Sequence, residues 1–121
     1  MPFATFRFII VEKNDFFAMD MAAGLHEACP LAKILRVTRS QDAVLLPQDA
    51  DYRTVIITSD RLSVIDSSGL AFYARDNDAL IVVRPGFDTE DEVLARGFEL
   101  LDVPFTDAAL LAFAQLMERA A

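Results

Sequence analysis

The residues best placed for chemistry in this sequence follow an apolar run, in the stretch VIITSDRL at positions 55–62. Three apolar residues predict a buried strand, and Thr58, Ser59 and Asp60 come directly after it. In α/β domains, functional groups gather beyond the carboxyl ends of the strands. The stretch therefore raises the question of whether this cluster is chemically reactive or lacks the residue that would make it so.

Short apolar runs alternate along the chain with segments of helical period. Asn14 or Asp15 is the expected N-cap of a first helix that ends before Pro30, and Thr89 and Glu92 form a capping box for another. The predicted strands are 6–11, 34–37, 55–58, 80–83 and 98–101. The predicted helices are 15–28, a short one from 40 stopped by the proline at 47, 67–74, 89–97, and a last one from a Thr106 cap.

Five β-α units with strands that do not alternate polar and apolar residues predict a parallel sheet covered on both faces by helices. Right-handed crossovers make it a flavodoxin-like doubly wound sheet of order 2-1-3-4-5. With 121 residues and no linker, the chain is expected to be one domain over residues 1–121. The predicted core contains Ile9, Ile10, Val55, Ile57, Ile81 and Val83.

Composition narrows the function classes. Nineteen acidic residues against eleven basic ones give a net charge of −8, which argues against nucleic-acid binding. No apolar run is long enough to span a membrane, and we expect a cytoplasmic protein, since one cysteine, Cys29, fits a reducing compartment. One histidine, His26, read as a surface residue, leaves no Ser-His-Asp set, and no metal-ligand spacing is present. We expect no enzyme and no cofactor.

Two segments resemble a known family. FIIVEKNDFFAMDMAAGLHEA, positions 8–28, resembles the opening of a bacterial response-regulator receiver domain, and ARGFELLDVPFTDAALLAF, positions 95–113, resembles its end. The resemblance implies two acids after the first strand that bind Mg²⁺ and a phospho-accepting Asp after the third. It also implies a Ser or Thr after the fourth strand and a Lys before the Pro-Phe pair.

This sequence departs from that pattern at most positions. Glu12 matches the first acid, but Lys13 stands in place of the second and Thr58 in place of the phospho-acceptor. Arg84 replaces the hydroxyl residue, and Val103 replaces the lysine. Because acyl-phosphate formation needs a carboxylate nucleophile beside a divalent cation, these replacements predict a degenerate pocket without phosphoryl chemistry or metal.

The replacements also suggest what the pocket contains. Lys13 and Arg84 bring two cations there, and Glu12 or Asp60 could pair with them, so that a salt-bridge network replaces the metal and fixes one signalling state. The alternative is that these are ordinary solvated loop charges, each worth little. A further alternative makes Asp60 a substitute phospho-acceptor.

A second motif competes with the receiver resemblance. VIDSSGLA, positions 64–71, resembles the Asp-Ser-Ser-Gly-Leu stretch of STAS domains, the anti-sigma factor antagonists, which implies a phosphosite at Ser67. A STAS domain opens mainly with strands, so a hairpin of the first two strands would favour it. The alternative is structural: Asp66 and Ser67 cap the helix predicted over 67–74, and Gly69 permits close packing.

The expected function is a stand-alone receiver-like signalling domain that binds an unidentified protein partner without phosphorylation. The competing readings are a regulator phosphorylated on Ser67 or Asp60 and a small-molecule module that uses the vacated pocket. Leu111 and Leu116 lie off the main apolar stripe of the last helix, which suggests a homodimer through this helix. That stripe contains Leu110, Phe113, Ala114 and Met117. The alternative is that this helix is buried on two sides within the domain.

Overall fold

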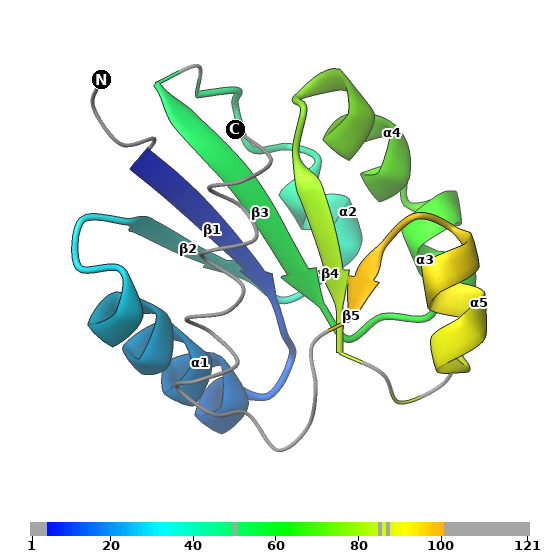
Figure 1. Cartoon of the computed structure of the whole chain (residues 1–121), viewed down its shortest axis with the longest axis horizontal. Helices are drawn as coiled ribbons and strands as arrows, with labels where there is room; N and C mark the ends of the chain where they lie inside the picture. Colours follow the sequence, from blue (N-terminus) through cyan, green and yellow to red (C-terminus); the bar gives the residue numbers. More distant parts are fainter. Residues whose placement is uncertain (1–4, 50, 85, 87, 101–121) are drawn as a thin grey trace.

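A parallel five-stranded sheet of order β2-β1-β3-β4-β5 forms the centre of the molecule, as the sequence predicts (Figure 1). The computed structural model describes residues 5–49, 51–84, 86 and 88–100. All four neighbouring strand pairs are parallel. The strands are β1 (Thr5–Val11), β2 (Lys33–Val37), β3 (Tyr52–Thr58), β4 (Leu80–Val83) and β5 (Glu99–Leu100).

Helices cover both faces of this sheet. The long helix α1 packs on one face, and four short helices pack on the other (Figure 1). They are α1 (Asp15–Ala28), α2 (Ser40–Ala43), α3 (Leu62–Ser67), α4 (Leu70–Asp76) and α5 (Glu90–Ala95). No helix among the described residues is long and apolar enough to cross a membrane.

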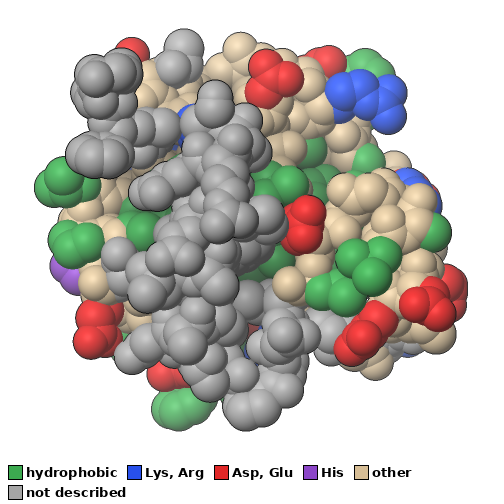
Figure 2. Space-filling model, viewed as in Figure 1, with side chains coloured by type: hydrophobic (Ala, Val, Ile, Leu, Met, Phe, Trp, Pro, Cys, Tyr) green, Lys and Arg blue, Asp and Glu red, His purple; other side chains and the backbone are tan. Residues whose placement is uncertain are grey.

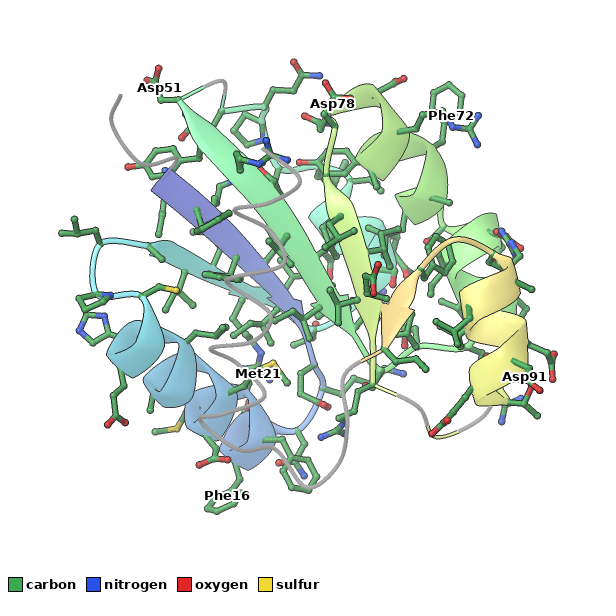
Figure 3. The ribbon with its side chains drawn as sticks, viewed as in Figure 1. Phe16, Met21, Asp51, Phe72, Asp78 and Asp91 are labelled. Carbon is green, nitrogen blue, oxygen red and sulfur yellow. The ribbon has the colours of Figure 1, made fainter. Side chains whose placement is uncertain are left out.

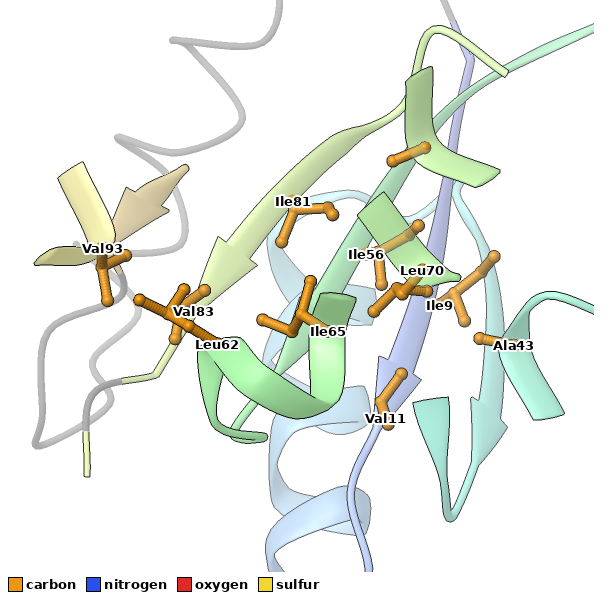
Figure 4. Packing of buried hydrophobic residues seen from close by; sticks show 11 residues of the cluster. Ile9, Val11, Ala43, Ile56, Leu62, Ile65, Leu70, Ile81, Val83 and Val93 are labelled. Carbon is orange, nitrogen blue, oxygen red and sulfur yellow. The ribbon is translucent and has the colours of Figure 1, made fainter. Parts of the chain in front are cut away.

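Two apolar clusters sandwich the sheet, because successive residues of a strand point to opposite faces. On the α1 side, Ile10 and Ile57 pack with Met21 and Leu25 of the helix. On the other side, five strand residues pack against α2 to α5: Ile9, Val11, Ile56, Ile81 and Val83 (Figure 4). All six residues predicted for the core are buried: Ile9, Ile10, Val55, Ile57, Ile81 and Val83.

The predicted caps of two helices are present. The Asn14 side chain accepts a hydrogen bond from the Phe17 N–H at 3.1 Å and so begins α1. At α5, the Thr89 hydroxyl accepts from the Glu92 N–H at 3.1 Å and lies 2.9 Å from the Glu92 carboxylate. Both bonds satisfy N–H groups that the first turn of a helix leaves without a partner.

In place of the one helix predicted over 67–74, the structure has two: α3, which begins earlier and ends at Ser67, and α4, which begins at Leu70 after Gly69. Gly69 has φ of 84°, a left-handed conformation that glycine adopts without steric cost. Beyond its chain neighbours, no described heavy atom lies within 4 Å of the position that a Cβ would take, so the expectation of close packing at Gly69 is wrong. Asp66 and Ser67 are the last two residues of α3, so the expectation that they cap the helix predicted over 67–74 is also wrong; the Leu70 N–H at the start of α4 donates to the Ser68 hydroxyl instead.

The opening of the chain also decides between the two family resemblances. β1 and β2 pair in parallel and are joined through α1. The STAS alternative required these two strands to form a hairpin, which is antiparallel. The order strand, long helix, parallel strand is that of the receiver fold, and nothing in the described structure supports the STAS alternative.

Candidate functional site

The register of the sheet brings the candidate residues together. Val37, Val11, Thr58 and Val83 are paired in sequence across β2, β1, β3 and β4, so these strands end level with one another. The residues that follow them therefore meet at one edge of the sheet. Figure 1 shows this carboxyl edge at the arrowheads of the strands, beside the first turn of α1.

Glu12 is the centre of this group. It directly follows β1, is 7% exposed, and its backbone N–H donates to the Val37 carbonyl at 3.0 Å. Its carboxylate accepts from the Asn14 N–H at 3.1 Å and lies 3.5 Å from the Ser59 hydroxyl. A buried carboxylate needs charged or hydrogen-bonded partners, and these contacts supply hydrogen-bonded ones for Glu12.

Arg84 supplies the countercharge. Its Nη2 lies 3.1 Å from Glu12 Oε1, and both side chains are largely removed from solvent. The guanidinium also lies 4.9 Å from the centre of the Phe17 ring, a cation–π contact from the first turn of α1. The Arg84 backbone N–H donates to the Thr58 carbonyl at 2.9 Å, which fixes the start of this loop on β3. The cation thus joins β1, β4 and α1.

Thr58, at the position of the expected phospho-acceptor, is buried and already engaged. Its hydroxyl oxygen accepts from the Asp60 N–H at 3.0 Å. This local side-chain-to-backbone bond shapes the turn after β3. A hydroxyl is a weak nucleophile without an adjacent base, and no carboxylate or imidazole contacts Thr58 within the described chain.

Asp60 has a different partner from the one that was hypothesised. Its carboxylate accepts from the hydroxyl of Ser40, the buried first residue of α2, at 2.6 Å. This contact links the loop after β3 to α2. Among the described residues, neither Lys13 nor Arg84 forms an ion pair with Asp60.

Lys13 does not join the network either. Its side chain is exposed and has no ion pair with any described residue. The second cation that stabilises this loop is Arg36 of β2, which donates from Nε and Nη2 to the Glu12 carbonyl at 3.0 and 2.8 Å. Arg36 also pairs with Asp15 at 2.8 Å. The observed network therefore contains Glu12, Arg84 and Arg36, with Lys13 outside it.

The remaining candidates lie away from this group. Ser67 is exposed at the end of α3, His26 is exposed in the last turn of α1, and Cys29 is a half-buried thiol without a disulfide. Val103 and the last predicted helix lie outside the described residues. No three His, Cys, Asp or Glu side chains of the described chain are grouped so as to hold a metal ion.

Several residues of this edge were missed as site members in the sequence. Phe17, in the first turn of α1, is 45% exposed and places its ring against the Arg84 guanidinium. Arg36 carried a usable signal, since it is the one charged residue inside the predicted apolar strand 34–37. Ser40 carried none, because a serine that starts a helix is first read as a cap.

Comparisons with solved structures agree with this architecture. CpaE from Burkholderia thailandensis, named for pilus assembly, superposes with a TM-score of 0.71 at 12% identity, covering 97% of this chain and 100% of that one. The signal receiver domain of a Colwellia psychrerythraea DNA-binding response regulator (merR) gives 0.67 at 20%, covering 93% and 97%. The chemotaxis response regulator CheY4 of Vibrio cholerae gives 0.67 at 15%, covering 93% and 98%.

No protein-family model and no curated protein sequence matches this chain. The structural likeness extends over nearly the whole of each receiver domain. The strand order of this chain, β2-β1-β3-β4-β5, is the one predicted from its sequence. The chain therefore has the fold of response-regulator receiver domains. At identities of 20% or less, this likeness establishes the fold alone.

Proposed function

We propose that this chain is a signalling domain of receiver fold that acts by binding a protein partner and does not accept a phosphoryl group. The observation that carries the proposal is the Glu12–Arg84 ion pair, 3.1 Å long, at the carboxyl edge of the sheet. In the family that the sequence resembles, this edge holds Mg²⁺ and the phosphoryl group. Here a guanidinium neutralises the one acid that matches the metal-binding pair.

The chemistry of the neighbouring residues supports the same conclusion. Hard cations take several oxygen ligands, whereas Glu12 is occupied by Arg84 and the Asn14 N–H. A second carboxylate is missing at Lys13, and the Thr58 hydroxyl is bonded within its own turn. A phosphoryl transfer without a metal, a carboxylate nucleophile or a base has no group to stabilise its transition state.

The fold supports a signalling role, and the name of one similar structure points to assembly as another role of the same scaffold. Receiver domains of response regulators are among the similar structures, but CpaE, named for pilus assembly, superposes equally well. The same scaffold therefore occurs in proteins named for assembly as well as in those named for signal reception. In our proposal, the Glu12–Arg84 ion pair stands in place of the metal and the phosphoryl group and holds the domain in one conformation, which a partner recognises.

Incubation with Mg²⁺ and acetyl phosphate tests the chemical half of this proposal. The intact mass of the chain is expected to stay unchanged, while a receiver domain with its phospho-acceptor Asp, treated in parallel, gains one phosphoryl group. A gain equal to the mass of one phosphoryl group on this chain would overturn the proposal.

The D60N variant then identifies the site of any modification. Loss of the added mass in D60N, together with lability of the bond in alkali, would assign an acyl phosphate to Asp60. An acid-stable phosphate that survives in D60N and disappears in S67A would assign it to Ser67 instead.

A further inference from the structure

The side of α1 that is turned away from the sheet carries an apolar row. Phe16 is 74% and Met19 is 72% exposed, and Ala23 is exposed as well. Because these residues are separated by three and four positions, they follow one another along a single face of the helix. Figure 3 shows the Phe16 side chain pointing away from the ribbon at the start of α1. Aligned apolar side chains that face water mark an interaction surface more strongly than scattered ones do.

The core of the domain does not use this row. The residues that α1 directs inward are Ala18, Met21 and Leu25, each at most 4% exposed. Met21 and Leu25 pack on the sheet with the strand residues of that side. Helix α1 is therefore apolar on two faces, and only the inner one is buried. A helix that is apolar all round is normally buried on all sides, so the outer face lacks a cover that its composition favours.

Acidic side chains lie beside the apolar row. Asp20 and Glu27 are exposed, and they lie four positions after Phe16 and Ala23, which makes each acid a surface neighbour of an apolar residue. Within the described part of the chain, no ion pair neutralises either carboxylate. Lys13 precedes the helix and lies outside both rows. The outer face of α1 thus combines apolar contact area with uncompensated negative charge.

The first turn of this face is attached to the Glu12–Arg84 ion pair. The Phe17 ring lies 4.9 Å from the Arg84 guanidinium, and the centres of the Phe16 and Phe17 rings are 6.1 Å apart in an edge arrangement. The N-cap residue Asn14 donates its backbone N–H to the Glu12 carboxylate at 3.1 Å. The carboxyl edge of the sheet therefore positions the turn that presents Phe16. A surface that is already ordered loses less entropy when a partner binds.

The charges of this face select its partner. In a two-fold dimer through α1, the same acidic patch of both copies would meet, and like charges oppose such contacts. An anionic membrane or a nucleic acid would be repelled for the same reason. A protein segment that carries apolar side chains flanked by lysine or arginine complements both rows, the apolar one and the acidic one.

We infer that the outer face of α1 is the docking surface for a partner protein's amphipathic helix that carries lysine or arginine beside its apolar face. Side chains three and four positions apart form ridges that fit the grooves of a second helix. Phe16 supplies an aromatic anchor, and such anchors contribute much of the energy of protein interfaces. Basic side chains of the partner then reach Asp20 and Glu27. The inference rests on the proposed function, because it names the surface and the partner class for the same interaction.

NMR titration of the ¹⁵N-labelled full chain with three synthetic peptides of about 18 residues tests this inference. The first peptide has leucines along one helical face and lysines beside them, the second has glutamate in place of each lysine, and the third has the composition of the first with its leucines scattered. We expect the first to give saturable shifts of the amides of Phe16, Met19 and Ala23. The other two should bind at least about tenfold more weakly. No saturable shift, shifts centred elsewhere, or equal binding of all three would overturn the inference.

Variants with matched controls locate the surface. F16A is expected to weaken the lysine peptide about tenfold, whereas F72A should leave its affinity unchanged, since Phe72 is 64% exposed on α4, across the sheet. The double variant D20K/E27K should bind the glutamate peptide more tightly than the lysine peptide. D76K, at an exposed position of α4, should keep the original preference. Equal losses in F16A and F72A, or a preference that D20K/E27K does not reverse, would contradict docking at α1.

Failure of this inference and failure of the proposed function give different results. If the chain gains no phosphoryl group and the lysine peptide does not bind at α1, the proposed function stands and this docking surface is wrong. If the chain gains a phosphoryl group, the proposed function is wrong, and the peptide titration still decides where an amphipathic helix binds.

Discussion

At the scale of single residues, the contribution of the Glu12–Arg84 pair to the free energy of unfolding depends on how completely both groups are buried. Exposed ion pairs contribute little, because solvent screens them and the side chains lose entropy. Glu12 is 8% and Arg84 is 24% exposed at the side chain, while Arg39 and Asp42 on the surface are 58% and 32% exposed. Loss of one partner therefore costs far more at the first pair than at the second.

We predict that R84M lowers the free energy of unfolding by about 1–3 kcal/mol, because it leaves the Glu12 carboxylate buried without a countercharge. Urea unfolding measures this loss. The double variant E12Q/R84M should lose less than the sum of the single variants, since the two side chains interact. R39M, in the exposed pair, should change stability by less than about 0.5 kcal/mol. Equal effects of R84M and R39M would contradict a structural role for the pair.

At the scale of elements, an ion pair connects two short helices that the sequence does not place together. Arg96, after α5, donates through both terminal nitrogens to the two carboxylate oxygens of Asp66 in α3, one of them at 2.8 Å. The hydrogen bond from Arg96 holds the pKa of Asp66 below its usual range, against a smaller opposing effect of desolvation. A bidentate pair of this kind fixes the relative orientation of the two groups in addition to their electrostatic attraction.

The pH dependence of this contact follows from the direction of the pKa shift. Because the folded state holds the pKa of Asp66 below its unfolded value, the stabilisation is present above the ordinary carboxyl pKa and is lost as pH falls through the folded value. We predict that NMR titration of the R96Q variant shows the Asp66 pKa rising toward its ordinary value. The effect on stability should be small, since both side chains are about half exposed. An unchanged pKa in R96Q would contradict the assignment.

At the scale of the whole molecule, the sequence predicts the sheet well and the helices on its second face less well. Apolar strands that lack alternation leave a parallel sheet covered on both faces as the one arrangement that buries them. The split between α3 and α4 depends on the left-handed backbone at Gly69, which a sequence pattern reads equally well as a helical glycine. β3 begins at Tyr52, earlier than predicted, because Arg53 and Thr54 are polar yet pair with β1.

The candidate site shows the same division. Because the strands end level, the sequence predicts which positions meet at the carboxyl edge, including Glu12 and Arg84. It does not predict which charges pair, since that depends on side-chain directions and on distant partners. Asp60 bonds Ser40, which lies 20 positions earlier in the chain, and the second cation at this edge is Arg36, bonded to the Glu12 backbone carbonyl, while Lys13 has no ion pair with a described residue.

Acidic side chains lie at several separate places on the visible face, among them the part formed by α5 (Figure 2). Leu94 of α5, the helix whose first turn holds Glu90, Asp91 and Glu92, is 51% exposed. The receiver resemblance implies pairing through a face that includes this helix and the predicted last helix, which lies outside the described residues. The sequence puts Leu111 and Leu116 off the main apolar stripe of that predicted helix. An apolar patch within an acidic surface favours a two-fold dimer.

We therefore predict that L111E and L94E each convert a dimer into a folded monomer, because a carboxylate buried in an apolar interface is costly. Sedimentation equilibrium measures the association, and circular dichroism shows that the variants remain folded. L45E is the matched control, since Leu45 is 79% exposed and follows α2, on another part of the surface. A wild-type chain that stays monomeric at high concentration, or a dimer that L45E disrupts as strongly as L111E, would show that this face is not the interface.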